Sequence, residues 1–241
     1  MKKLLFCLFI AFAATLIAAP DPNVDLSKTS MNVKEDLEKK LVALDLGIDP
    51  KASAAEIYSK ITSYVEKYIP DPKYPDDKLS LETIKQCLLA AKNGDYCIGA
   101  LIANEKGEIL VAGHNSQKSK NRSDYHGEMF VMNEFESNKN FDSYRKNLVY
   151  DKNLTLYSSA EPCPMCTIRL ITTELNSKFV ASSDDDGMTS RIQHLPRIWR
   201  DNSTRSTREK ANCSPALSSV AHILFYLSVF DAFRDKNSEG K

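Results

Sequence analysis

The sequence predicts an α/β fold in which helices cover a central sheet. Apolar residues at helical spacing alternate along the chain with short apolar runs that are bounded by turn residues, as in strands. From about residue 80 the predicted order is helix, strand, strand, helix, strand, helix, strand, which is the pattern of an α/β layer. The 241 residues, 42% of them hydrophobic, are enough for one ordinary domain with an extension.

The charge balance argues against a nucleic-acid partner. Lysine and arginine together number 32, as do aspartate and glutamate, so the formal net charge is zero. Tight binding to a phosphate backbone requires a basic surplus or a basic face. We therefore do not expect nucleic acid to be the partner.

The first 19 residues have the layout of a secretory signal peptide. Lys2 and Lys3 form a positively charged start, and residues 4–19 are uncharged and mostly apolar. The segment ends in small residues, as a cleavage site requires. A membrane anchor is the alternative, but the run is short for a full span. We expect an exported protein, periplasmic or secreted, with no stable membrane anchor once the leader is removed.

Residues 20–79 are predicted to be a linker followed by a helical extension. Residues 21–30 are polar and unpatterned, which is typical of a linker. Apolar residues at helical spacing predict one helix over 33–44 and a second over 52–68. The proline and aspartate cluster at 70–77 predicts a boundary. We expect the extension to pack on the main domain, with a partner-binding segment as the weaker alternative.

The main domain is predicted to span residues 80–235, with a tail at 236–241. Ser80 and Glu82 resemble a helix start, and Asn93-Gly94 would end that helix. Two strands follow at 96–103 and 108–113, joined by a turn.

Polar residues 116–122 predict a loop. The next helix is predicted to run from His126 to about Ser137. A strand at 153–158, a helix that opens at Pro162-Cys163 and a strand at 178–182 complete the pattern.

Two C-terminal segments have more than one interpretation. Residues 189–212 are rich in arginine and could contact a phosphate, but a solvated loop is the commoner case. Trp199 within them could stack on a base or simply pack the loop on the core. The apolar run at 218–233 is too short for a bilayer span and predicts a buried terminal helix or a dimer face.

Two short motifs carry the chemistry of the sequence. One is His126-Gly127-Glu128, and the other is Pro162-Cys163 followed by Cys166. A catalytic zinc ion takes three protein ligands and keeps a fourth position open for water. One imidazole nitrogen and two thiolates would be those ligands, so we predict a Zn²⁺ site at His126, Cys163 and Cys166. A redox-active Cys-x-x-Cys pair is the alternative, and it would leave the first motif unexplained.

Glu128 is predicted to be the catalytic residue. On a helix, residues i and i+2 do not share a face, so we do not expect one ion to bind both His126 and Glu128. The carboxylate can instead reach the water and move its proton. Three further cysteines remain outside the leader. Two of Cys87, Cys97 and Cys213 could pair in an oxidising compartment, or all three could be buried thiols.

These motifs resemble those of the cytidine-deaminase-like superfamily of zinc-dependent nucleobase and nucleoside deaminases, over about residues 80–183. The closest branch holds guanine deaminase, fungal cytosine deaminase and the tRNA adenosine deaminases. His126-Gly127-Glu128 is similar to fungal cytosine deaminase, and residues 161–166 are similar to guanine deaminase and the tRNA enzymes. Residues 113–115 are similar to the segment of the branch that carries the substrate-binding asparagine, and 230–233 loosely resemble the aromatic tail of guanine deaminase.

The resemblance implies a three-layer α/β/α sandwich around a mixed sheet, with residues 80–235 as a deaminase domain. It implies hydrolysis with release of ammonia, Zn²⁺ as the cofactor and a homodimer. Asn115 and the backbone N–H groups of Ala160 and Glu161 would bind the substrate.

The substrate is expected to be a free nucleobase or nucleoside, because export and a neutral charge do not suit a tRNA enzyme. We expect a purine, guanine-like, with cytosine or cytidine as the alternative. A non-catalytic zinc-stabilised binding protein and a secreted nucleic-acid deaminase are further alternatives.

Overall fold

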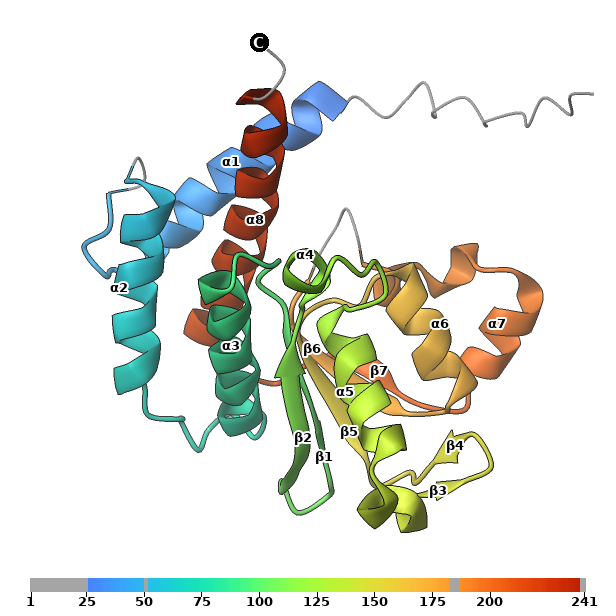
Figure 1. Cartoon of the computed structure of the whole chain (residues 1–241). Coiled ribbons are helices and arrows are strands. Elements are labelled where there is room, and N and C mark those ends of the chain that lie inside the picture. The colour runs from blue at the N-terminus through green and yellow to red at the C-terminus, as the bar shows by residue number, and fades with distance from the viewer. Residues whose placement is uncertain (1–25, 50–51, 183–186, 239–241) are drawn as a thin grey trace, which may run out of the picture.

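A five-stranded mixed sheet forms the centre of the molecule (Figure 1). Its strands lie in the order β2-β1-β5-β6-β7. β1 pairs antiparallel with β2 and with β5, whereas β5, β6 and β7 run parallel. Their bounds are Gly99–Ala103 for β1, Ile109–His114 for β2, Thr155–Ala160 for β5, Asn176–Ala181 for β6 and Arg208–Lys210 for β7.

The computed structural model describes residues 26–49, 52–182 and 187–238, with side chains from residue 35 in the first helix and to residue 229 in the last. The predicted signal peptide, residues 1–19, lies outside the described residues. None of the helices within these ranges has both the length and the apolar character that a membrane span needs.

Helices cover both faces of the sheet. On one face α3 (Asp77–Lys92) and α8 (Pro215–Ser238) pack against β1, β5 and β6. On the other face α5 (Gly127–Ser137) packs against β1 and β2, and α6 (Pro164–Thr172) follows β5 (Figure 1). The two largest hydrophobic clusters lie one on each side of the sheet. The predicted three-layer α/β/α fold is therefore confirmed.

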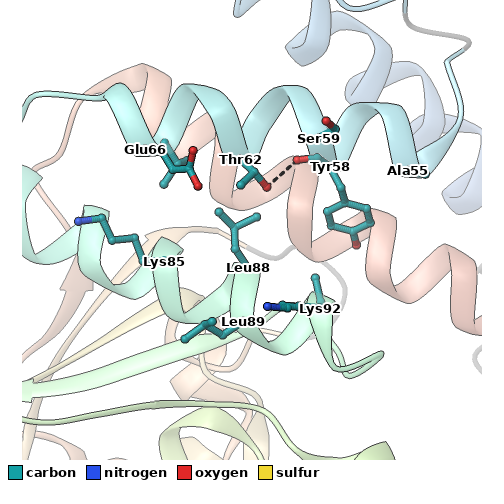
Figure 2. Close-up of a pocket in the computed structure, with 11 residues that line it drawn as sticks. Ala55, Tyr58, Ser59, Thr62, Glu66, Lys85, Leu88, Leu89 and Lys92 are labelled. Atoms are coloured by element: carbon teal, nitrogen blue, oxygen red, sulfur yellow. Dashed lines mark hydrogen bonds between the residues drawn. The ribbon is translucent and has the colours of Figure 1, made fainter.

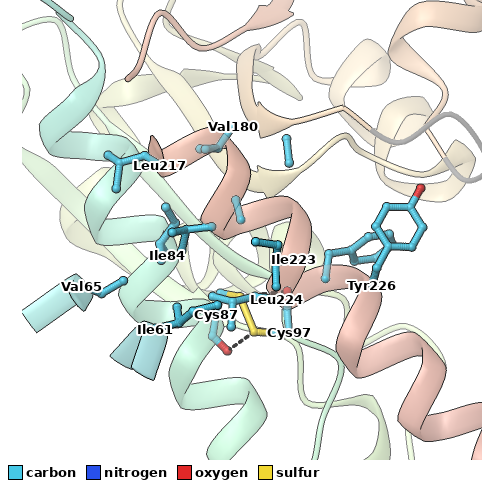
Figure 3. Packing of buried hydrophobic residues seen from close by; sticks show 14 of the residues in the cluster. Ile61, Val65, Ile84, Cys87, Cys97, Val180, Leu217, Ile223, Leu224 and Tyr226 are labelled. Atoms are coloured by element: carbon cyan, nitrogen blue, oxygen red, sulfur yellow. Dashed lines mark hydrogen bonds between the residues drawn. A yellow bond between two sulfur atoms is a disulfide. The ribbon is translucent and has the colours of Figure 1, made fainter. Parts of the chain in front are cut away.

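The larger cluster includes the N-terminal helices. α1 (Leu26–Ala43) packs against α8, and α2 (Ala54–Lys67) packs against α3 and α8. Apolar side chains of all four helices meet in this cluster, part of which Figure 3 shows. Ile61, Ile84 and Leu224 have no exposed surface there. The C-terminal apolar run is thus largely a buried helix of this core.

Two predicted helix boundaries are wrong. α1 begins at Leu26, inside the predicted linker 21–30, because no glycine or proline interrupts the chain between Leu26 and Ala43. α3 begins at Asp77 and not at Ser80. Ser80 lies buried inside the helix, because the turn-forming residues before it end at Asp76, which occupies the N-cap position.

Two predicted loops contain regular structure. Residues 116–122 include the single helical turn α4 (Gln117–Lys120). The arginine-rich segment 189–212 contains the 3₁₀ helix η2 (Thr189–His194), the helix α7 (Arg197–Ser203) beside α6, and β7. β7 escaped prediction because its three residues are all charged, so it lacks the apolar alternation of a strand.

The connection between α5 and β5 is a compact unit of its own. It holds the 3₁₀ helix η1 (Lys139–Tyr144) and a two-stranded hairpin of β3 (Arg145–Lys146) and β4 (Val149–Tyr150). The rings of Phe141 and Tyr150 each stack on Phe135 of α5. These contacts hold the unit against the C-terminal end of α5.

Cys87 of α3 and Cys97, just before β1, form a disulfide (Figure 3). Neither residue has exposed surface. This pairing decides among the alternatives that the sequence left open, and Cys213 remains a free thiol. The disulfide ties the C-terminal half of α3 to the residues just before β1.

A surface groove of about 680 Å³ lies between α2 and α3 (Figure 2). Leu88 and Leu89 of α3 lie along one side of it, and Tyr58 and Thr62 of α2 lie along the other. All of the residues that line the groove belong to α2 and α3. The groove is therefore separate from the two motifs at residues 126–128 and 162–166.

Candidate metal centre and catalytic site

The two motifs meet at the N-terminal ends of α5 and α6. His126 is the N-cap residue of α5 and Cys163 is the N-cap residue of α6. Both have extended backbone dihedral angles, and neither side chain forms a capping hydrogen bond. Because these side chains do not serve the helices, they are free to face each other. The positive ends of two helix dipoles also favour thiolates at this place.

The three predicted ligands have the spacing of a tetrahedral zinc site. Their donor atoms all lie within 4.8 Å of one another. Nδ1 of His126 lies 3.6 Å from Sγ of Cys163 and 3.7 Å from Sγ of Cys166. Ordinary Zn–S and Zn–N lengths at tetrahedral angles place sulfur and nitrogen about 3.6 Å apart. The residues present therefore fit a zinc ion, and Zn²⁺ is the cofactor of the site.

The two cysteines differ in acidity. The hydrogen bond from Cys166, with a further one from His126, lowers the pKa of Cys163 to about 4. The same contact with Cys163, together with burial, raises the pKa of Cys166 well above its ordinary value. Burial lowers the pKa of His126, but the hydrogen bond and charge of Cys163 outweigh it and leave it raised. The surroundings of Cys163 therefore favour its thiolate form, which is the form that binds a metal ion.

Glu128 lies beside the three ligands and is only 2% exposed. Oε1 accepts a hydrogen bond from the hydroxyl of Ser158 at 2.9 Å, and Oε2 lies 3.5 Å from Sγ of Cys166. Burial raises the pKa of the Glu128 carboxyl, and the negative charge of Cys163 raises it further. A buried carboxyl at this distance from the ligands is placed to exchange protons with a group at the metal.

Ser158 was not among the site residues predicted from the sequence. It lies on β5, on the same face as Leu156, which packs with α5 in the second hydrophobic cluster. Strand alternation could have shown that residue 158 faces α5. It could not have shown that Glu128 is the residue it meets.

The residue between His126 and Glu128 is a glycine, and there is little room for a side chain at this position. A Cβ atom there would lie 3.0 Å from the carbonyl oxygen of Ile98 and 3.4 Å from the backbone nitrogen of Asn115. This helix start therefore lies close against the residues that flank β1 and β2. The backbone of Asn115 therefore lies next to Gly127, the residue between His126 and Glu128.

Asn115 has no exposed surface. Its N–H donates to the carbonyl oxygen of Ile98 at 2.8 Å. Its side-chain oxygen accepts from the backbone N–H of Gln117 at 3.0 Å, and its amide donates to Oε1 of Gln117 at 2.8 Å. The side chain is thus held in one orientation by Gln117, a residue that the sequence did not single out.

Ala160 and Glu161 lie where β5 meets the second motif. Ala160 is paired with Ala181 of β6. The N–H of Glu161 donates to the carbonyl oxygen of Ala181 at 2.8 Å, so it is not available to a substrate as the sequence analysis expected. The pairing with β6 continues one residue past β5 and uses this donor. The Glu161 carboxylate accepts instead from the backbone N–H of Ser190 at 2.8 Å.

The arginine-rich segment is partly neutralised. Arg205 pairs with Glu174 at 3.0 Å, and Arg208 bonds Ser206 and lies in β7 at the sheet edge. Arg197 and Arg200 are exposed on α7. Trp199 lies half-buried on the same helix. One arginine of the segment is thus paired with a carboxylate, and two others lie exposed on α7.

The family assignment follows from comparison with known proteins. Residues 75–182 match the family model described as the cytidine and deoxycytidylate deaminase zinc-binding region. The tRNA-specific adenosine deaminase of Rickettsia felis is 30% identical over 107 residues, which cover 43% of this chain and 67% of that protein. The chain belongs to the cytidine-deaminase-like superfamily. Members of this superfamily are zinc-dependent hydrolases that act on C–N bonds.

Other relatives show a similar degree of identity to this chain. The tRNA-specific adenosine deaminase of Bacillus subtilis is 30% identical over 112 residues, covering 46% of this chain and 65% of that protein. The chain thus spans about two thirds of the length of these relatives.

Two solved structures resemble the chain in fold. The guanine deaminase of Nitrosomonas europaea has a TM-score of 0.45 at 18% identity, over 69% of this chain and 91% of that one. A tRNA:A34 deaminase has a TM-score of 0.42 at 16% identity, over 54% and 93%.

Proposed function

We propose that the chain is a hydrolytic, zinc-dependent deaminase of a free nucleobase or nucleoside, with a guanine-like purine preferred. The observation that supports it most directly is the buried Glu128 carboxylate beside a His-Cys-Cys set with zinc spacing. A site that bound zinc only for stability would take a fourth protein ligand and would not need a buried acid at this place. The non-catalytic alternative therefore leaves Glu128 unexplained.

His126, Cys163 and Cys166 would hold the zinc ion. When bound, the ion supplies a water molecule that is acidic enough to lose a proton near neutral pH. Glu128 would accept that proton at its carboxylate and pass it to the ring nitrogen as the hydroxide adds to the amine-bearing carbon. It would then carry the second proton of the water, from the added hydroxyl, to the amine, which leaves as ammonia. Burial raises the pKa of the Glu128 carboxyl. The carboxylate therefore takes up a proton readily and can give it back within the same turnover. Ammonia and the oxo form of the base are the products.

Asn115 is proposed to bind the edge of the base. It is buried next to the start of α5, and its amide group carries both a donor and an acceptor. A substrate would compete with Gln117 for these groups, so binding would require the Asn115–Gln117 pair to open. Ala160 would contribute only main-chain contacts, because its side chain is a methyl group.

A small substrate fits the charge distribution better than tRNA. The net charge is zero, and Arg205 is already paired with a carboxylate. Polynucleotide binding relies on several free cations aligned on one face. The similarity to tRNA-specific adenosine deaminases nevertheless makes adenosine in tRNA the specific second candidate. Cytosine or cytidine is the third.

Ammonia release distinguishes these candidates. Zinc-loaded protein would be offered guanine, adenine, cytosine, their nucleosides and a tRNA with adenosine in the anticodon loop, with Glu128→Ala as the control. We expect release from a purine base or nucleoside that is lost in Glu128→Ala while zinc stays bound at one ion per chain. Release from tRNA alone would replace the small-molecule proposal. No release from any substrate, with zinc bound, would favour a binding protein.

We also propose export and a homodimer. The leader-like residues 1–19 support export, and the disulfide between Cys87 and Cys97 is of the kind that persists in oxidising compartments. The dimer follows from the family resemblance. The side chains of 230–233, which resemble an aromatic tail, lie outside the described residues. Fractionation of cells and light scattering of the purified protein test the two points separately.

A further inference from the structure

Each oxygen of the Glu128 carboxylate lies beside a side chain that can donate a hydrogen bond. Oε1 accepts from the hydroxyl of Ser158 at 2.9 Å, and Oε2 lies 3.5 Å from Sγ of Cys166. Glu128 and Cys166 are almost completely buried, and Ser158 has no exposed surface. Both contacts are therefore shielded from bulk solvent.

The two contacts differ in strength. A hydroxyl donor at 2.9 Å makes an ordinary hydrogen bond, whereas a thiol is a weak donor and its sulfur lies at 3.5 Å. Cys166 is also one of the three residues with zinc spacing. The two oxygens of Glu128 are therefore unequal, one held by the Ser158 hydroxyl and one facing the candidate metal centre.

Ser158 is well suited to fix a carboxylate. It lies in β5, in the middle of the sheet, where it pairs with Ala100 of β1 and Phe179 of β6. A residue paired on both sides in a central strand has little freedom to move. The short serine side chain adds one rotatable torsion, so the position of its oxygen is set by the strand itself.

We propose that Ser158 is a positioning residue that holds Oε1 of Glu128, so that Oε2 is the oxygen that moves protons at the metal centre. This inference rests on the proposed deaminase activity. It assigns a role to a residue outside the zinc motif, on a strand that the motif does not include. The carboxylate would otherwise be free to turn about its terminal torsion, which is broad for glutamate.

The test compares Ser158→Ala, Ser158→Thr and Ser158→Val in zinc-loaded protein. Threonine keeps the hydroxyl, and valine has the same shape without it. We expect kcat to fall about 10- to 100-fold in the alanine and valine variants, with KM within about twofold of wild type, because a misplaced catalytic group costs rate more than binding. Threonine should restore most of kcat. Equal loss in threonine and valine would show that packing, not the hydroxyl, matters.

Ser159→Ala provides a matched control. The hydroxyl of Ser159 accepts from the N–H of Gly99 at 3.0 Å on the opposite face of β5. Its removal deletes a buried hydrogen bond of the same strand without touching Glu128. We expect this variant to lose some stability and to keep kcat. A fall in kcat equal to that of Ser158→Ala would overturn the assignment.

A crystal structure of zinc-loaded Ser158→Ala gives a readout that does not depend on turnover. We expect Glu128 to occupy more than one orientation there and a single one in Ser158→Thr. A single, wild-type orientation in the alanine variant would overturn the proposal even if the substrate were unknown. If wild-type protein releases no ammonia from any substrate, the proposed function fails, and the crystal structures still decide whether Ser158 holds Glu128.

Discussion

The hydroxyl of Tyr157 on β5 donates to Oδ1 of Asp76 at 2.7 Å, which joins the middle of the sheet to the residue before α3. The same carboxylate accepts from Nζ of Lys178 at 3.0 Å and from the N–H of Asn212 at 2.7 Å. Asp76 is 4% exposed. One buried carboxylate thus connects β5, β6 and the segment that leads into α8, and its partners come from far along the chain.

Asp76→Asn should destabilise the fold by about 2–4 kcal/mol, because it leaves the Lys178 ammonium without its buried partner and gives Tyr157 a poorer acceptor. Urea unfolding of the two proteins measures the difference. Glu209→Gln is the matched control, since Glu209 is 58% exposed and lies 3.5 Å from the same ammonium. That change should cost less than about 0.5 kcal/mol. Equal effects would show that the Asp76 network adds nothing to an ordinary surface pair.

This network also shows why part of the fold was not predictable. The start of α3 was predicted at Ser80, because Ser80 and the nearby Glu82 resemble a helix start. The true start depends on Asp76 and Asp77, whose carboxylates are used by Asn212 and Ser214. Local propensity carries no information about partners more than 130 residues away. By contrast, the boundaries predicted from apolar periodicity lie within about three residues of the observed ones for α2, α5, β1, β2, β5 and β6.

The candidate site divides in the same way. Its metal ligands and Glu128 were identified from spacing alone, because the chemistry fixes the intervals in the chain. The contributions of Ser158 and Gln117 depend on which side chains meet across elements, and no spacing encodes that. The N–H of Glu161 was expected to bind the substrate because of the family resemblance, whereas the pairing of β5 with β6 extends one residue further and uses this donor for Ala181.

Gly99→Ala should destabilise the fold strongly. A Cβ atom at this position would lie 2.0 Å from the carbonyl oxygen of Thr83 and 2.5 Å from the backbone nitrogen of Cys87, both in α3. Backbone atoms cannot move aside as a flexible side chain can, so we expect a loss of about 3 kcal/mol or more. Gly127→Ala, with its nearest contact at 3.0 Å, should cost about 1 kcal/mol and retain zinc. Thermal unfolding would rank the two, and the reverse order would contradict the proposed close contact of α3 with β1.

Removal of zinc should expose Cys163 to alkylation. The pKa of this thiol is lowered to about 4, so it is a thiolate at neutral pH once the metal is gone. Iodoacetamide should modify Cys163 of chelator-treated protein at pH 6 as well as at pH 8, whereas the buried Cys166, whose pKa is raised, should react slowly. Peptide mass spectrometry identifies the modified residue. Zinc added before the reagent should protect both cysteines, and failure of that protection would contradict their assignment as ligands.

His222 should make the fold sensitive to acid. Burial, and next the positive charge of Lys40, lower the pKa of His222 to about 4, although Asp36 lies 2.9 Å from Nε2. Asp36 is 47% exposed, so water screens its opposing effect. The unfolded chain has an ordinary histidine pKa of about 6.5 and binds the proton more readily than the folded chain. Stability is therefore full above about pH 6.5 and falls as the pH drops towards 4, by about 2–3 kcal/mol.

Unfolding by urea at pH 7.0, 5.5 and 4.5 measures this loss, and His222→Phe shows whether it belongs to His222. Phenylalanine keeps a ring against Tyr226, which lies 4.6 Å from the imidazole between ring centres, and it does not titrate. We expect the variant to lose clearly less stability than wild type between pH 7.0 and 4.5. Because His222 joins α8 to α1, the acid-sensitive contact should lie in the N-terminal helices rather than at the metal centre. Parallel losses in both proteins would assign the acid sensitivity to other groups.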